Sequence, residues 1–200
     1  MMTDKKCILM MFAEFLLTLL ISVFGFMLLS WTFDYSWGMP VYSIIFTLVF
    51  FAFIYCRMWN KAKSDIKYQK ENVSLKHAFK VILPLAAFLA VIVALFGLIK
   101  LNIIPVRDIV TDVQYILEEN QPRQIHEVLL IDNLNLVMRA LFIFLIGFFK
   151  SSDTSVLILF VAPAVVVVAG LLGYFAGMKK FYLSDVIAQT QQKVKDKFNE

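Results

Sequence analysis

Charged side chains are scarce in this sequence of 200 residues, where Asp, Glu, Lys and Arg together make up 17%. An average soluble domain carries about 25% charged and about 45–50% apolar residues. Here the apolar fraction is 60%, which is more than one soluble core of this size can hide from water. The composition therefore argues against an ordinary soluble domain and favours a surface that faces lipid.

Cysteine and histidine are rarer still, with two residues of each. Cys7 and Cys56 stand at the edges of apolar segments and form neither a CxxC redox motif nor a metal pair, so we interpret both as small apolar side chains. His77 falls in a basic loop and His126 in an acidic region, and we expect both to be exposed on opposite sides of a membrane. The sequence therefore predicts no metal site and no cofactor.

Long apolar segments dominate what is present. A helix that crosses the hydrocarbon core of a membrane needs about 20 mostly apolar residues. Four segments meet this length: Cys7–Trp31, Met39–Tyr55 with its flanks, Ala78–Ile99 and Ser155–Met178. The first is longer than the apolar region of a signal peptide and lacks a cleavage site of small residues, so we expect it to be retained as a helix.

A fifth segment, Leu134–Phe149, is ambiguous because Arg139 interrupts it and its uninterrupted part, Ala140–Phe149, is about half a span. A fifth crossing would put the lysine-rich C-terminus outside the cell. We therefore predict an all-α integral membrane protein with four transmembrane helices and an outer amphipathic or re-entrant segment. Five transmembrane helices are the alternative.

Lysine and arginine next to the spans predict the orientation, because they are enriched on the cytoplasmic side. Lys5 and Lys6 precede the first span, and a basic loop follows the second, with Arg57, Lys61, Lys63, Lys67, Lys70, Lys76 and Lys80. The intervening Thr32–Gly38 has neither residue type and is flanked by tryptophan, as expected at an outer interface. We predict a cytoplasmic N-terminus, one membrane domain over residues 1–178, and a basic, helical cytoplasmic tail over residues 179–200.

The acidic outer region contains apolar residues at helical spacing in Val106–Glu119, with Asp108, Asp112 and Glu119 between them. This pattern predicts an amphipathic helix that lies on the membrane or on the other helices.

Two charges fall within apolar segments and are the candidate polar site. Glu14 lies in the first span, where a carboxylate is costly, so it either takes part in function or reaches a partner on a neighbouring helix or the interface. Arg139 follows Asp132, Asn133 and Asn135 by one to two helical turns. In a full span these four residues would form a site for a polar or anionic substrate, whereas at the interface Arg139 would reach a headgroup phosphate.

Small residues recur every four positions in the last span, and small residues at this spacing let helix backbones approach closely. They are Ala169, Gly173 and Gly177, with Gly170 beside them. Packing within the chain and homo-oligomerisation both account for them.

The sequence contains one string that resembles part of a catalytic motif. Glu118, Glu119 and Arg123 form the string EExxxR, which begins the signature of the intramembrane CAAX-type prenyl proteases. That family also needs later histidines on transmembrane helices to hold a metal ion, and only His126 follows here. We therefore interpret the string as coincidental and expect no enzyme.

Several strings together resemble an uncharacterised set of small multipass membrane proteins from Gram-positive, clostridia-like bacteria. They are Tyr42-Ser-Ile-Ile-Phe-Thr-Leu-Val-Phe-Phe, the basic loop after Trp59, Asn135-Leu-Val-Met-Arg139, and Gly173-Tyr-Phe-Ala-Gly-Met-Lys-Lys. The resemblance implies a multipass topology in a bacterial cell membrane. It implies no active residues.

These observations rank the possible functions. We expect a non-catalytic membrane protein, an accessory, regulatory or scaffold subunit whose partners are the lipid bilayer, other membrane subunits or a second copy. The alternative is a small-solute transporter or a substrate-binding membrane subunit, which Glu14 and the Asp132–Arg139 group favour. The formal net charge of +4 reflects the lysines beside the spans, so no nucleic acid is expected as a partner.

Overall fold

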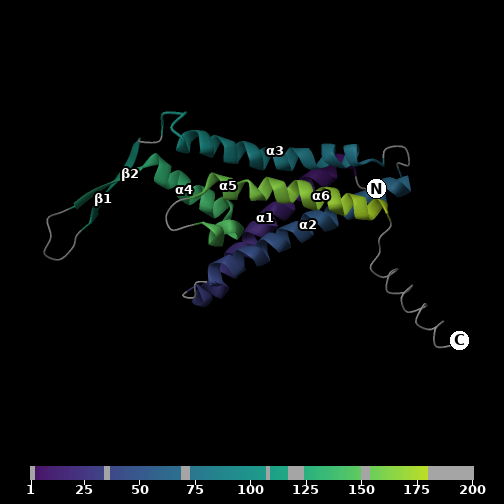
Figure 1. Cartoon of the computed structure of the whole chain (residues 1–200), viewed down its shortest axis with the longest axis horizontal. Coiled ribbons are helices and arrows are strands. Elements are labelled where there is room, and N and C mark those ends of the chain that lie inside the picture. Colours follow the sequence, from purple (N-terminus) through teal and green to yellow (C-terminus); the bar gives the residue numbers. More distant parts are fainter. Residues whose placement is uncertain are drawn as a thin grey trace.

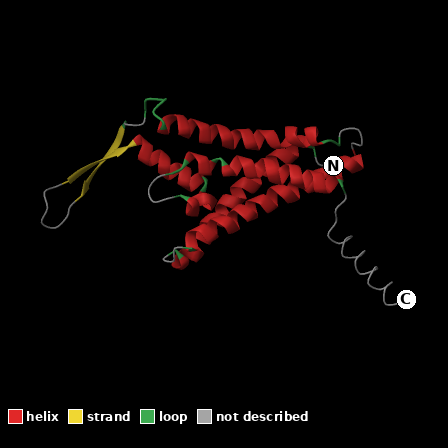
Figure 2. Ribbon diagram, viewed as in Figure 1, coloured by secondary structure: helices red, strands yellow, loops and turns green. Residues whose placement is uncertain are grey.

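Four long helices form the bundle in this computed structural model, which describes residues 3–33, 37–68, 73–106, 109–116, 124–149 and 154–179. They are α1 (Asp4–Leu29), α2 (Gly38–Tyr68), α3 (Leu75–Lys100) and α6 (Val161–Met178), with the short helix α5 (Val156–Leu159) directly before α6 (Figures 1 and 2). Counting α5 and α6 as one, all four are long and apolar enough to cross a membrane. The predicted four-span membrane fold is confirmed.

The two ends of the bundle are separated by about the thickness of a membrane. His77 and Lys100 are 23 residues apart on α3, which at 1.5 Å per residue is about 34 Å. The hydrocarbon core of a bilayer is about 30 Å thick. The first turn of α1 and the last turns of α6 lie at the His77 end, because His77 contacts Asp4 of α1 and also Asp65, to which Tyr174 of α6 donates a hydrogen bond. We call this the His77 end and the opposite one the Lys100 end.

The basic region between the second and third spans is mostly helical, so its prediction as a loop was wrong. The helix α2 continues past the apolar stretch to Tyr68, and α3 begins at Leu75, where the Ser74 side chain accepts a hydrogen bond from the His77 backbone N–H at 3.2 Å. The apolar residues Ile54, Met58 and Ala62 are fully buried at a spacing of four. This periodicity carries the helix beyond the membrane boundary and keeps one face packed.

The acidic outer region forms a β-hairpin where an amphipathic helix was predicted over Val106–Glu119. Strand β1 (Val110–Ile116) pairs antiparallel with β2 (Gln124–Leu129), with Val113 opposite Glu127. Valine, threonine, tyrosine and isoleucine are enriched in β1, and these residue types favour extended backbone. Asp108 and Glu119, which entered the helical prediction, lie outside the described residues, as do Glu118 and Arg123 of the EExxxR string.

The ambiguous segment Leu134–Phe149 folds as a helix, α4 (Leu130–Leu141), followed by a 3-10 helix, η2 (Ile143–Phe148). The ring of Phe144 lies 5.2 Å from that of Phe50, which is midway between Gly38 and Lys61 on α2. The chain then returns to Thr154, whose hydroxyl accepts a hydrogen bond from Arg139 Nε at 3.0 Å. The segment therefore enters and leaves at the Lys100 end, where Lys100 Nζ donates a hydrogen bond to the Thr154 carbonyl oxygen at 2.6 Å, so it is re-entrant and is not itself a crossing.

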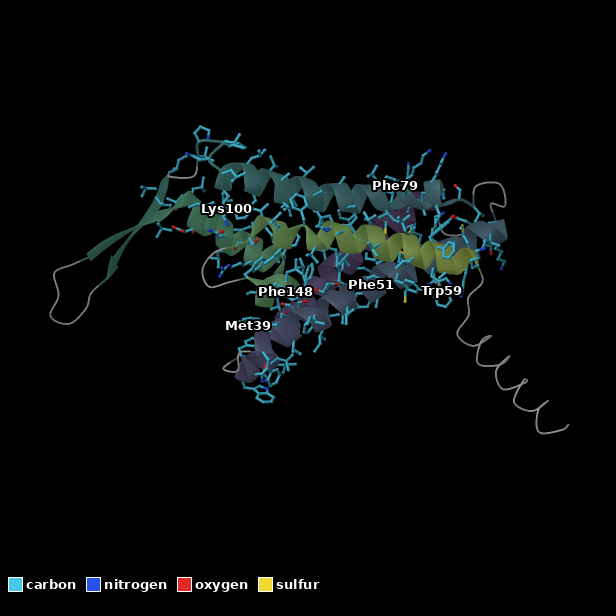
Figure 3. All side chains as sticks on the ribbon, in the orientation of Figure 1. Met39, Phe51, Trp59, Phe79, Lys100 and Phe148 are labelled. Atoms are coloured by element: carbon cyan, nitrogen blue, oxygen red, sulfur yellow. The ribbon has the colours of Figure 1, made fainter. Side chains whose placement is uncertain are left out.

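Two features let the re-entrant segment pack against α2. The Ser43 hydroxyl, fully buried, accepts a hydrogen bond from the Gly147 N–H at 2.7 Å. A Cβ atom on Gly147 would overlap the Met39 carbonyl oxygen, so only glycine permits this approach. Figure 3 shows Met39 and Phe148 on these two segments. Inside a membrane every backbone polar group needs a partner, and Ser43 supplies one to Gly147.

Of the tail predicted over residues 179–200, only Lys179 is described; residues 180–200 lie outside the part of the chain that the structure describes.

Candidate functional site

Polar side chains from all four spanning helices meet at the His77 end. The Lys61 ammonium on α2 lies 2.7 Å from Asp4 Oδ1 on α1 and also pairs with Asp65, one turn further along α2. Tyr174 on α6 donates a hydrogen bond to Asp65 Oδ2 at 3.0 Å. His77 Nε2 on α3 lies 3.4 Å from Asp4 Oδ1 and 3.6 Å from Asp65 Oδ2. We call these five residues the four-helix network.

The centre of the four-helix network is removed from solvent. Lys61 is fully buried and Asp65 is 1% exposed, while the Asp4 side chain is 45% exposed. With neutral His77 the network holds one cation and two carboxylates; with protonated His77 it holds two of each. A buried charge is tolerated only with a partner, so each helix depends on the others at this point.

Sequence reasoning missed this network. Lys61 was interpreted as one of several topology signals, and the prediction that His77 is an exposed loop residue was wrong, since its side chain is 17% exposed. The sequence did contain one indication of the network. Lys61 and Asp65 are four residues apart, so they are neighbours on a helix, and both lie on the buried face of α2. Nothing in a single sequence indicated that Asp4 and Tyr174 join the same pair.

Glu14, the first candidate intramembrane charge, pairs with Arg57 on α2. The Arg57 guanidinium donates through Nε to Glu14 Oε1 at 2.7 Å and also lies 3.2 Å from the Met10 sulfur. The Glu14 and Arg57 side chains are 13% and 26% exposed. Glu14 follows Asp4 by ten residues, about 15 Å along α1, so this ion pair lies deeper in the membrane than the four-helix network.

The second candidate group, Asp132, Asn133, Asn135 and Arg139, does not form one site. Asp132 Oδ2 caps α4 by accepting from the Leu129 N–H at 3.2 Å, and Asn133 donates to the Thr111 hydroxyl at 2.7 Å. Asn135 Oδ1 is buried without a hydrogen-bond partner among the described residues. Arg139 instead bonds Thr154, so these residues fix the hairpin and the re-entrant segment to the bundle.

The small residues of the last span lie inside the bundle. Ala169, Gly170, Gly173 and Gly177 are all buried. A Cβ atom on Gly173 would overlap the Tyr55 carbonyl oxygen, and one on Gly177 would come within 2.7 Å of the Ala62 Cβ. One on Gly170 would meet the Ile82 side chain at 2.6 Å. Within this chain these residues therefore bring α6 close to α2 and α3.

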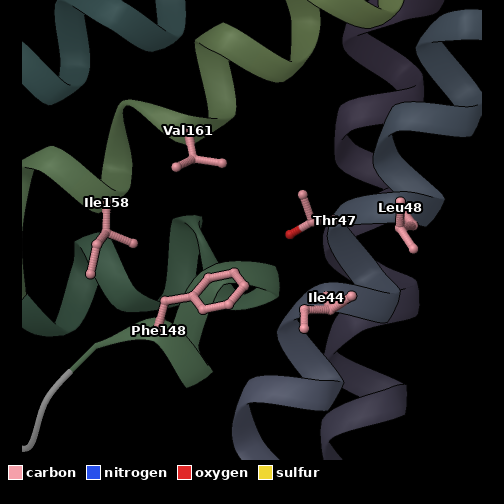
Figure 4. Close-up of a pocket in the computed structure, with 6 residues that line it drawn as sticks. All are labelled: Ile44, Thr47, Leu48, Phe148, Ile158 and Val161. Atoms are coloured by element: carbon pink, nitrogen blue, oxygen red, sulfur yellow. The ribbon is translucent and has the colours of Figure 1, made fainter.

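A cavity of about 540 Å³ lies between α2, η2 and the junction of α5 with α6 (Figure 4). Apolar side chains form most of its lining, which comprises Ile44, Thr47, Leu48, Phe148, Ile158 and Val161. Leu48 is 61% exposed and Ile44 49%, so the cavity opens towards the lipid. The Thr47 hydroxyl is buried without a hydrogen-bond partner among the described residues.

Within the described part of the chain, no three or more His, Cys, Asp or Glu residues are grouped so that they could hold a metal ion. Cys7 is buried with its sulfur 3.9 Å from that of Met58, while Cys56 is exposed. Comparison with family models, with curated proteins and with solved structures gives no match to this chain.

Proposed function

We propose that this membrane protein is non-catalytic and works as an accessory, regulatory or scaffold subunit that acts through partners in the bilayer. The observation that carries the proposal is the pairing of buried charges within the bundle. Glu14 pairs with Arg57, and Lys61 with Asp4 and Asp65. These charges brace one helix against another, which leaves the lipid-facing surfaces as the places where a partner would bind.

The lysine distribution supports an orientation for this subunit. Exposed Lys5, Lys6, Lys67, Lys76 and Lys80 all belong to the His77 end. Positive residues favour the cytoplasmic side, so we place the His77 end in the cytoplasm and the β-hairpin outside. The resemblance to small clostridial membrane proteins favours the cell membrane of a bacterium as its location.

Purification from mild detergent tests the subunit role. The tagged full-length chain would be solubilised from its native membrane and analysed by size and by mass spectrometry. The proposal expects a stoichiometric membrane partner or a defined oligomer. Recovery as a lone monomer from several mild detergents would contradict it.

A small-solute transporter is the second candidate, favoured by one arrangement. A re-entrant segment and a discontinuous helix, α5–α6, meet at the cavity of Figure 4, and transporter sites are often built from discontinuous helices near the middle of the membrane. The apolar lining and lateral opening of this cavity are less suited to a polar solute than to lipid.

Labelling separates the two candidates. In a Thr47→Cys variant reconstituted in liposomes, a transport path filled with water would let a membrane-impermeant maleimide reach residue 47. A lipid-filled cavity would leave it unlabelled, with modification at each cysteine read by peptide mass spectrometry. A Trp37→Cys variant serves as the control for an accessible position, because Trp37, directly before α2, is 56% exposed.

A further inference from the structure

We propose that the seam between α3 and α6 is a binding site for an anionic phospholipid, with its phosphate on Lys76 and Lys80 and one acyl chain along the seam. This inference is independent of the proposed subunit role. It rests on two cavities, on the residues that line them and on the position of the two lysines.

The first cavity lies at the His77 end and has a volume of about 490 Å³. Leu75, Phe79 and Leu171 provide its apolar lining, and Lys76 and Lys80 complete it. Figure 3 shows Phe79 at this end of α3, with Lys100 at the other. Both lysines are exposed and lie within three residues of His77, so they are level with the four-helix network at the membrane boundary.

The second cavity, of about 590 Å³, continues along the same two helices towards the middle of the membrane. Small side chains line much of it, with larger apolar residues around them: Ala86, Ala87, Ala90, Ala164, Leu83 and Phe160. On α3 it begins at Leu83, three residues after Lys80, and on α6 at Val168, three residues before Leu171. The two cavities are thus one helical turn apart on both helices, and we call them together the α3–α6 groove.

The length of the α3–α6 groove suits a lipid chain. From Lys76 to Ala90 is 14 residues, which is about 21 Å along α3. The chains of one leaflet occupy about 15 Å, half the thickness of the hydrocarbon core. An acyl chain that starts at the boundary beside Lys80 can therefore lie in the groove over its whole length.

Charge complementarity decides which lipid fits. Lys76 and Lys80 are one turn apart on one helix, and neither has an ion-pair partner among the described residues. A phosphate between them supplies the missing negative charge. Basic pockets between transmembrane helices on the cytoplasmic side recognise anionic headgroups in this way. An apolar partner helix or a second copy of this groove would leave both lysines uncompensated.

The test is a lipid titration of the purified full-length chain in mild detergent, followed by native mass spectrometry. Phosphatidylglycerol is compared with phosphatidylcholine carrying the same acyl chains. Each lysine near an anionic surface contributes about a fivefold change in binding, so we expect phosphatidylglycerol to bind about 25-fold more tightly. This preference should fall as salt is added.

Variants assign the binding to the groove. The double variant Lys76→Gln/Lys80→Gln should lose the preference for phosphatidylglycerol, and Lys76→Arg/Lys80→Arg should keep it. The matched control, Lys5→Gln/Lys6→Gln, removes two exposed lysines from the same end and should change binding less than twofold. Ala87→Leu should weaken the binding of both lipids by filling the groove, whereas Ala13→Leu on exposed α1 surface should not.

Several outcomes would overturn the proposal. They are equal binding of the two lipids by the unmodified chain, a preference that salt does not reduce, or equal losses in the control and the Lys76→Gln/Lys80→Gln variant. A dimer that forms through the groove and is broken by Ala87→Leu without any change in lipid binding would assign the groove to a second copy. Should the glutamine variant not fold, the salt titration and the arginine variant still decide.

Discussion

The ammonium nitrogen of Lys61 lies 2.7 Å from Oδ1 of Asp4, the first residue of α1. The contact connects the beginning of the first span to the part of α2 that extends beyond the apolar stretch. Through Asp65 it also reaches Tyr174 on α6. A single buried cation thus lies at the point where the ends of the helices are held together, so its removal should affect the whole bundle.

Replacing Lys61 with methionine should destabilise the protein by about 3 kcal/mol, because breaking a buried ion pair leaves an uncompensated charge. Asp65, which is 1% exposed, would then have lost its cationic partner, and the carboxylate of Asp4 would still lie nearby. The free energy of unfolding in mixtures of detergent and SDS measures the effect. Lys67→Met is the matched control, since Lys67 is exposed near the end of the same helix. Equal losses in both variants would show that Lys61 acts only through surface charge.

The spans could be predicted from sequence because apolar length alone determines them. Four stretches of about 20 apolar residues leave few alternatives in lipid, and the structure has four such helices. A re-entrant segment could also be predicted from the sequence, because Arg139 shortens the apolar stretch and the flanking charges disfavour a fifth crossing. Its depth was not predictable, because the contact between Phe144 and Phe50 joins residues far apart in the chain.

The polar network and the hairpin escaped prediction for different physical reasons. The network needs four helices to converge, and the sequence gives no distance between Asp4, Asp65 and Tyr174. The hairpin was mistaken for a helix because Val110 and Val113 are three residues apart, a separation typical of one face of a helix. Pairing with β2 decided in favour of a strand, and that partner is a tertiary contact. Local sequence patterns therefore predicted the helices that are buried in lipid correctly. They did not predict the network and the hairpin, which depend on contacts between distant segments.

The Glu14–Arg57 pair should show strong coupling. Glu14→Leu or Arg57→Leu alone leaves one charge inside the membrane and should cost about 2–3 kcal/mol. The double variant should recover most of that loss, because no charge remains. Unfolding measurements on the three variants form a double-mutant cycle. If the double variant loses the sum of the two single effects, the residues act independently and the pair does not stabilise α1 against α2.

The re-entrant segment should depend on one hydroxyl. Ser43→Ala removes the acceptor for the Gly147 N–H in a region without water, and should cost about 1–3 kcal/mol. We expect faster cleavage by proteases near residues 141–149 and a lower melting temperature. The control is Ser30→Ala, because the Ser30 hydroxyl is exposed and donates to the carbonyl oxygen of Met27, three residues earlier. Comparable cleavage in both variants would argue against Ser43 as the anchor.

Gly173 should be the least tolerant position of the last span. In an open helix, glycine to alanine stabilises by up to about 1 kcal/mol, because alanine has the higher helix propensity. At Gly173 a methyl group would overlap the Tyr55 carbonyl oxygen, a backbone atom that cannot move aside, so overpacking should cost about 1–3 kcal/mol. Gly97→Ala is the matched control, since its methyl would meet two atoms of the Val156 side chain, at 3.2 and 3.8 Å, and these can move aside.

Unfolding and size measurements on the two glycine variants also separate packing within the chain from association between chains. Packing within the chain predicts that Gly173→Ala lowers the free energy of unfolding at every protein concentration, while Gly97→Ala leaves it nearly unchanged. Association through this helix face predicts instead a change in oligomer size with unaltered stability of the monomer. Because Gly173 is buried against α2 inside one chain, the first result is the one that the geometry requires.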